Sequence, residues 1–287
     1  MRAAIAGDIC GSRFERSLWQ GTTFSEAICI GYDVPKPRFD ATGEKAETFE
    51  LFHLDCYVTD DSILMLALID WILHQGELKH YLRKHFLASS RPELFGKGFR
   101  GWASQNKNES CHSFGNGAAM RVAPIGYVSD DPVRVRELAR ESALVTHQVP
   151  DAVVGAEAIA LGVLLARTGS SKEEIQQELL PLLGDRLLKP LDEIRPGYRF
   201  TSSSADTVPL ACRAFLEAET YEETLRRAIS VGGDSDTIAC MAGALAGAFW
   251  GTPSSVRSHV SAYLGGEQLD LLMDFEAEYP AAKRTIF

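Results

Sequence analysis

The chain has 287 residues, of which 29 are basic and 39 acidic, giving a formal net charge of −10. This excess of acid argues against a surface that grips nucleic-acid phosphates, although it leaves room for a local basic pocket for one phosphorylated ligand. No Gly- or Ser-rich linker divides the sequence, so we expect one domain over residues 1–287.

Helical patterns dominate, and no segment shows the sustained apolar alternation of a β-strand. Residues 60–74 are apolar on most sides, which predicts a buried helix. Ser171 and Glu174 have the spacing of a capping box, and residues 121–125 fit a strand or a helix equally well. We therefore expect an all-α fold with helices at 60–74, 132–145, 151–167, 172–183, 208–217, 221–229, 236–250 and 267–278.

Two stretches are irregular, residues 31–52 and 196–205. The first is long for a loop in a compact domain, and such loops are commonly functional lids or mobile segments. Gly243, Gly247 and Gly251 recur every four residues in the last strongly apolar helix, which predicts close packing against a neighbour.

The sequence indicates a cytoplasmic protein that does not enter a membrane. The apolar stretch 238–250 is too short to span a bilayer, and Asp8 interrupts the only apolar run near the N-terminus that resembles a signal peptide. The six cysteines are scattered without a CxxC pair, so we expect reduced thiols and no zinc site.

Two acidic segments open apolar helices far apart in the chain, Thr59-Asp60-Asp61-Ser62 and Gly232-Gly233-Asp234-Ser235-Asp236-Thr237. Each on its own is explained by helix capping, because Thr, Ser and Asp suit the positive end of a helix dipole. Each nevertheless carries more acid than a cap needs. The pair therefore favours a single shared site for hard metal ions.

Glu15 follows a glycine-containing segment, Gly7 to Ser12, that lets backbones approach closely. Alone it is explained as a solvated charge. If it joined Asp60, Asp61, Asp234 and Asp236, five carboxylates would repel one another unless protons or cations neutralised them. Two divalent cations would bring that set near balance, and all-oxygen ligands favour Mg²⁺ or Mn²⁺.

The segment Gly115-Asn116-Gly117 predicts a tight turn before a short helix, an arrangement that can hold a phosphate. An ordinary turn explains the same pattern. His147 lies at a corner between two predicted helices, where it either supports a helix C-terminus or faces a ligand.

Taken together, these segments resemble the ADP-ribosylglycohydrolase family, which includes the dinitrogenase-reductase-activating glycohydrolases. The matching motifs run in family order from residue 7 to about residue 251. They are Gly7-Asp8-x-x-Gly11-Ser12-x-x-Glu15, Thr59-Asp60-Asp61-Ser62, Gly115-Asn116-Gly117-x-x-Met120-Arg121, Thr146-His147, Thr207-Val208-Pro209 and Gly232-Gly233-Asp234-Ser235-Asp236-Thr237.

The resemblance implies a compact orthogonal helix bundle that binds two Mg²⁺ ions, with Asp236 as their bridge. The implied metal ligands are Thr59, Asp60, Asp61, Asp234, Asp236 and Thr237. The implied catalytic residues are Glu15, Asp60 and Asp61, with the general acid or base either Glu15 or Asp60. The implied ADP-ribose-binding residues are Ser113, Phe114, Gly115, Asn116, Gly117, Met120 and His147.

The expected function is Mg²⁺-dependent hydrolysis that releases ADP-ribose from a modified protein or a related conjugate. Arginine, serine, another amino acid, a nucleic acid and O-acetyl-ADP-ribose stay open as the linked group. An inactive ADP-ribose-binding or partner-blocking protein on the same scaffold is the non-enzymatic alternative. A metal phosphohydrolase would share the oxygen ligands but would release inorganic phosphate.

Overall fold

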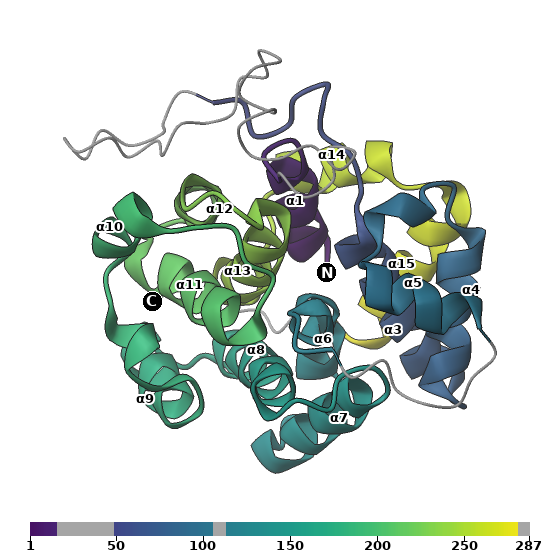
Figure 1. Ribbon diagram of the computed structural model, residues 1–287, viewed down its shortest axis with the longest axis horizontal. Coiled ribbons are helices and arrows are strands. Elements are labelled where there is room, and N and C mark those ends of the chain that lie inside the picture. The colour runs from purple at the N-terminus through teal and green to yellow at the C-terminus, as the bar shows by residue number, and fades with distance from the viewer. Residues whose placement is uncertain (16–48, 106–112, 281–287) are drawn as a thin grey trace.

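The computed structural model describes residues 1–15, 49–105 and 113–280, and within them every regular element is helical (Figure 1). The all-α prediction is confirmed. Pairing of extended backbone in the described ranges is limited to one isolated bridge between Gly115 and Ser203. Most of the irregular stretch 31–52 lies outside the described residues.

The eight predicted helices all correspond to observed ones. They are α3 (Asp60–His74), α7 (Pro132–Leu144), α8 (Pro150–Thr168), α9 (Lys172–Leu183), α11 (Ser204–Glu217), α12 (Tyr221–Ser230), α13 (Ser235–Trp250) and α15 (Gly266–Glu278). Their starts follow the sequence signals: the Thr59 side chain caps α3, and Ser171 and Glu174 form the predicted capping box of α9.

Several helices were not predicted. These are α1 (Arg2–Ser12), α4 (Leu78–Ala88), α5 (Lys97–Ser104), the short α10 (Leu191–Ile194) and α14 (Ser254–Tyr263), with 3₁₀ turns at Pro92–Leu94, Ala123–Tyr127, Gly184–Leu188 and Arg195–Gly197. The short α6 (Gly117–Arg121) follows the Gly115-Asn116-Gly117 turn, as expected. Helices α1, α4, α5 and α14 begin without a side-chain cap, so the usual start signal is missing. The ambiguous residues 121–125 lie at the end of α6 and in the following 3₁₀ turn.

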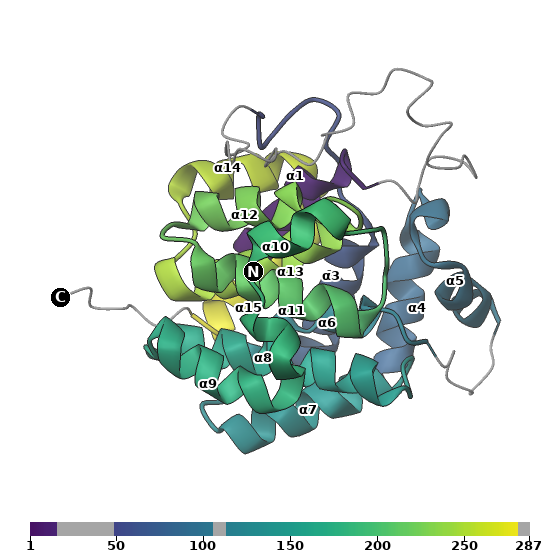
Figure 2. The same cartoon turned by 60° about the vertical axis from the view of Figure 1, so that its left-hand side comes forward.

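Helix α13 lies at the centre of the described helices, against α1, α8, α11 and α12 (Figures 1 and 2). Its first thirteen residues, 235–247, are buried, as are all residues of α1. Glycines allow these two helices to touch. A Cβ added at Gly7 would lie 2.0 Å from the Ala239 carbonyl oxygen, and one at Gly11 would lie 2.5 Å from the Asp236 Cα.

The close-packing prediction for the glycines of α13 is confirmed at two positions and wrong at the third. A Cβ at Gly247 would lie 2.1 Å from that of Ala3 in α1, and one at Gly243 would lie 2.6 Å from the Ala3 carbonyl oxygen. Gly251 instead follows the last residue of α13 with φ +81° and no neighbour within 4 Å of an added Cβ, so it ends the helix.

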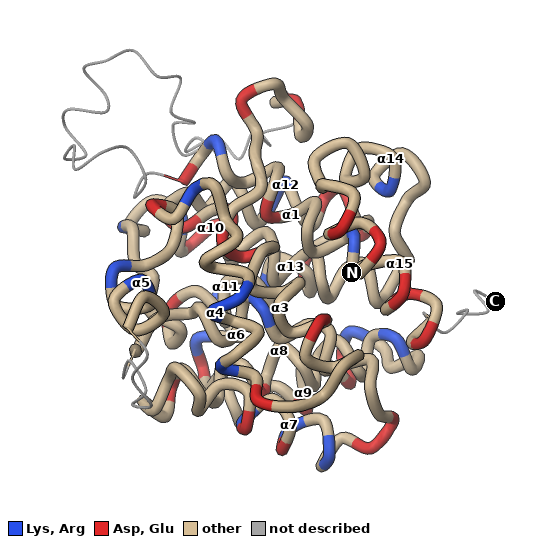
Figure 3. Tube along the Cα trace, turned by 90° about the vertical axis from the view of Figure 1, so that its right-hand side faces the viewer, with Lys and Arg blue, Asp and Glu red and all other residues tan. Residues whose placement is uncertain are grey.

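Acidic and basic residues are interspersed along the chain, as Figure 3 shows. The described helices include none with the length and apolarity needed to cross a bilayer. Four cysteines fall in the described ranges, and Cys10, Cys56, Cys212 and Cys240 are all buried free thiols.

We predict that Gly11→Ala lowers the free energy of unfolding by about 1–3 kcal/mol, because the new methyl group forces α1 away from the start of α13. Chemical denaturation measures the change. Gly101→Ala in α5 is the matched control: an added Cβ there meets nothing within 4 Å, and helix propensity favours alanine by up to about 1 kcal/mol. Equal effects of the two substitutions would contradict the proposed tight contact.

Candidate metal centre

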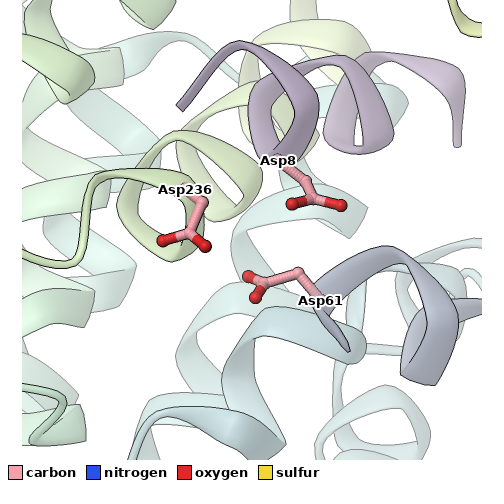
Figure 4. Close-up of side chains that lie close together, drawn as sticks. All are labelled: Asp8, Asp61 and Asp236. Atoms are coloured by element: carbon pink, nitrogen blue, oxygen red, sulfur yellow. The ribbon is translucent and has the colours of Figure 1, made fainter. Parts of the chain in front are cut away.

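Carboxylates from three helices converge at the junction of α1, α3 and α13. Figure 4 shows the side chains of Asp8, Asp61 and Asp236 directed into one common space. Each offers an oxygen within 4.8 Å of the other two, and Glu15, Asp234 and Asp236 form a second set by the same measure. Because Asp236 belongs to both sets, the two carboxylate clusters adjoin one another.

A pair of glycines creates the turn that presents Asp234 and Asp236. After α12 ends, Gly232 and Gly233 adopt φ values of +77° and +68°, the left-handed region in which side chains are strained. A Cβ at Gly233 would also lie 2.8 Å from the Tyr198 ring. The chain therefore reverses tightly, and α13 begins with both carboxylates at its N-terminus.

Burial sets the electrostatics of the site. It raises the pKa of Glu15, Asp60, Asp61 and Asp236 well above their usual values, and repulsion from neighbouring carboxylates raises these pKa values further. The pKa of Asp234 is also raised by burial, against a hydrogen bond from Asn116 that opposes the shift. Protein groups alone therefore do not stabilise five ionised carboxylates here.

The donor set fits divalent cations. Asp61 Oδ1 is buried and has no hydrogen-bond partner among the described residues. The second oxygen of this carboxylate, Oδ2, lies 3.2 Å from both Thr59 Oγ1 and Thr237 Oγ1. An orphaned buried oxygen beside hydroxyl and carboxylate oxygens is what a hard cation such as Mg²⁺ or Mn²⁺ would satisfy.

The acidic residues of this cluster other than Asp8 line a cavity of about 290 Å³. Twelve of the sequence-predicted site residues line it: Glu15, Asp60, Asp61, Ser113, Gly115, Asn116, Gly117, Met120, His147, Asp234, Asp236 and Thr237. Two do not. Thr59 lies behind Asp61 as the cap of α3, and the Phe114 side chain is 64% exposed.

Most polar groups of the Gly115-Asn116-Gly117 turn bond to other parts of the protein, which the sequence did not indicate. The Gly115 amide donates to Ser113 Oγ at 3.1 Å, and the Asn116 amide donates to the Ser202 carbonyl at 2.8 Å. The Gly117 amide has no such bond among the described residues. The Asn116 side chain donates from Nδ2 to Asp234 Oδ2 at 2.6 Å, which joins this turn directly to the acidic cluster.

His147 is buried against the same turn. A Cβ at Gly117 would lie 3.4 Å from its Nε2, and its Nδ1 lies 2.7 Å from Thr146 Oγ1. Burial, together with the positive charge of Arg121, lowers the pKa of His147 to about 3. The imidazole is therefore neutral at physiological pH and offers a hydrogen bond rather than a charge to the cavity.

Sequence reasoning missed other residues of this region. The sequence assigned no role to Asp8, although it is fully buried beside Asp61 and Asp236. Burial raises its pKa to about 6 against hydrogen bonds from Thr59 and Ser62. Arg121, Phe99 and Phe200 line the cavity. A charged residue in the middle of an apolar run was the available signal for Asp8, and the two phenylalanines gave none.

Fold and site together define an all-helical protein with a buried cluster of carboxylates beside a cavity. The chain belongs to the ADP-ribosylglycohydrolase family, whose model matches residues 1–283. It is 32% identical to the ADP-ribosylhydrolase ARH3 of Mus musculus across 95% of this chain and 88% of that protein. It is also 36% identical to an uncharacterized protein of Archaeoglobus fulgidus, over 46% of this chain and 48% of that protein.

The alignments to the archaeal relative and to several others span only about half of their length. Among solved structures, a chain described as an ADP-ribosylglycohydrolase-related protein complex superimposes with a TM-score of 0.65. The alignment covers 98% of this chain and 95% of that one at 21% identity, a likeness that establishes the shared fold.

We predict that Mg²⁺ raises the melting temperature more at pH 7.5 than at pH 5. The raised carboxylate pKa values, about 6 for Asp8, mean that the native protein holds more protons than the unfolded chain. Cation-free stability therefore falls as pH rises from the unfolded pKa values near 4 through the folded ones. Bound cations replace those protons and remove the penalty.

Thermal unfolding with Mg²⁺ or with a chelator at both pH values measures this difference, and sodium chloride of matched ionic strength is the control. At a Mg²⁺ concentration 100 times the dissociation constant, binding to the native state contributes about 2.7 kcal/mol. A chelator that leaves the midpoint unchanged at both pH values would rule out the cation site.

Proposed function

We propose that this protein is an Mg²⁺-dependent hydrolase that releases ADP-ribose by cleaving the bond at the anomeric carbon of the distal ribose. This proposal rests mainly on two carboxylate sets that share Asp236, which itself lines the cavity together with Ser113, Gly115, Asn116, Gly117, Met120 and His147. The ARH3 relatives are described as ADP-ribosylhydrolases, which supports the same reaction class.

In this proposal Thr59, Asp60, Asp61, Asp234, Asp236 and Thr237 hold two cations, Mg²⁺ or alternatively Mn²⁺. When bound, such ions supply positive charge that orients ribose hydroxyls and lowers the pKa of a water. Asn116 holds Asp234 in place through the 2.6 Å hydrogen bond. This bond fixes the position of the cavity-lining turn relative to the proposed cation site.

The cavity is small for a complete nucleotide sugar. At about 290 Å³ it lies at the lower end of small-molecule sites, so we place the distal ribose and diphosphate within it. The Gly117 amide and neutral His147 offer hydrogen bonds there. Phe200 in the cavity wall and exposed Phe114, between two wall residues, provide apolar surface for the adenosine end.

Glycosidic cleavage passes through an oxocarbenium-like state and needs one group to move a proton. Glu15 and Asp60 both line the cavity, and burial raises both pKa values, which favours a carboxyl group that can carry a proton. Asp61 accepts a hydrogen bond from Thr237 Oγ1, and we assign it to cation binding. The roles of Glu15 and Asp60 are separable by the pH profiles of their amide variants.

The proposed substrate is an ADP-ribosylated protein or a related conjugate, and the product is free ADP-ribose. We propose that the chain acts as one domain in the cytoplasm. The intact set of acids favours turnover over a role as an inactive ADP-ribose-binding protein.

We predict Mg²⁺-dependent release of ADP-ribose from at least one member of a panel of defined conjugates through arginine, serine and acetyl ester. Chromatography of the products distinguishes ADP-ribose from inorganic phosphate, and titration calorimetry detects binding without turnover. Binding of ADP-ribose with no release from any conjugate would replace this proposal with the inactive-binder alternative. Inorganic phosphate as the product would favour a phosphohydrolase.

We predict that Asp236→Asn lowers turnover by more than about 100-fold, because loss even of a second-shell partner costs about 10–100-fold at metal sites. The substitution preserves side-chain volume, so circular dichroism and the melting curve should still show a folded helical protein. Asp270→Asn, on an exposed position of α15, is the matched control and should leave turnover unchanged. Near-normal turnover in Asp236→Asn would exclude Asp236 as the shared ligand.

A further inference from the structure

Asp8 makes hydrogen bonds that distinguish it from the other carboxylates of the cluster. Its carboxylate accepts four hydrogen bonds from the start of α3. The Thr59 amide donates to Oδ2 at 3.1 Å and the Ser62 amide at 3.3 Å, while the Ser62 hydroxyl donates to the same oxygen. The Thr59 hydroxyl donates to Oδ1 at 2.6 Å. A carboxylate has about four lone-pair sites, so these bonds occupy most of its capacity.

The hydroxyl of Thr59 has only one hydrogen, and its direction matters. Two carboxylates compete for it: Asp8 Oδ1 at 2.6 Å and Asp61 Oδ2 at 3.2 Å. The shorter contact lies in the range of strong charge-assisted O–H···O⁻ bonds, and the longer one lies beyond the usual O–H···O range. The hydrogen therefore points to Asp8. Of the two lone pairs of Thr59 Oγ1, one accepts from the Asp61 amide at 3.3 Å and the other is left on the Asp61 side.

That arrangement leaves oxygen facing oxygen without a proton between them. Thr59 Oγ1 meets Asp61 Oδ2 as one acceptor meeting another, and Asp61 Oδ1 has no partner among the described residues. When Asp61 is ionised, a buried contact of this kind is unfavourable unless a cation lies beside it. The Thr59 oxygen and Asp61 Oδ1 are thus the oxygens left for a cation, because Asp61 Oδ2 also accepts from Thr237 Oγ1 at 3.2 Å.

We propose that Asp8 is a positioning residue: it takes the Thr59 hydroxyl hydrogen so that the Thr59 oxygen presents a lone pair to a divalent cation. Asp8 acts through Thr59 and is not itself a ligand. This inference rests on the cation site of the proposed function, but it concerns a different residue and a different readout, the affinity for the metal alone.

Asp8→Asn tests the polarity of this bond. With its amide oxygen in the place of Oδ2, asparagine still accepts hydrogen bonds from Thr59 N, Ser62 N and the Ser62 hydroxyl, so the cap of α3 survives. Its NH₂ group then lies where Oδ1 was and donates to Thr59 Oγ1. The Thr59 hydrogen is driven toward Asp61 and the cation. We expect Mn²⁺ affinity to fall about 10–100-fold, as for other second-shell substitutions.

The experiment measures Mn²⁺ binding to the full chain by titration calorimetry and electron paramagnetic resonance, with thermal unfolding of each cation-free variant. Thr59→Val should lose affinity to a similar degree, and Thr59→Ser, which keeps the hydroxyl, should restore it. Ser62→Ala removes a different donor to Asp8 and should lower the melting temperature while leaving Mn²⁺ affinity unchanged.

The double variant Asp8→Asn with Thr59→Val separates positioning from direct ligation. If Asp8 acts through Thr59, the double variant binds Mn²⁺ no more weakly than Thr59→Val alone. Losses that multiply would show that Asp8 is a ligand itself and would overturn the inference. Unchanged affinity in Asp8→Asn would overturn it too. Wild-type protein that binds no Mn²⁺ would instead remove the cation site of the proposed function.

Discussion

The structure depends on a balance between burial and charge where α1, α3 and α13 meet. Helix packing removes Asp8, Asp61 and Asp236 from water, and desolvation raises their pKa values. Repulsion from neighbouring carboxylates adds to the shift for Asp61 and Asp236. Such a junction is stable only with protons or cations. The centre that we propose for catalysis is also the part of the core whose stability depends most on what it binds.

The surrounding fold brings these acids together by backbone contact. Gly7 and Gly11 let α1 lie directly against α13, and the Gly232–Gly233 turn places two carboxylates at the first turn of α13. Asp8 then links α1 to the start of α3 by accepting from Thr59 and Ser62. Contacts within the protein therefore fix three helix ends relative to one another.

The sequence predicted the elements with strong local signals. Helix α3 has an apolar run after a Thr cap and α9 has a capping box, so both were found with correct ends. Helix α1 was missed because Asp8 was interpreted as an interruption of an apolar stretch, and only the tertiary fold shows what that carboxylate binds. The motifs identified twelve cavity-lining residues, but they could not show side-chain direction. Asn116 lies in the expected turn, and its side chain also donates to Asp234, which the sequence did not indicate.

The bond from Asn116 to Asp234 has a thermodynamic consequence for the function that we propose, because Asn116 lines the cavity and also holds a carboxylate of the proposed cation site. The two binding equilibria are then joined by reciprocity: whatever factor a bound nucleotide sugar applies to the affinity for the ions, the ions must apply to the affinity for the sugar. Product that binds more tightly when the ions are abundant, and ions that bind more tightly while product is bound, would be two expressions of the same free energy.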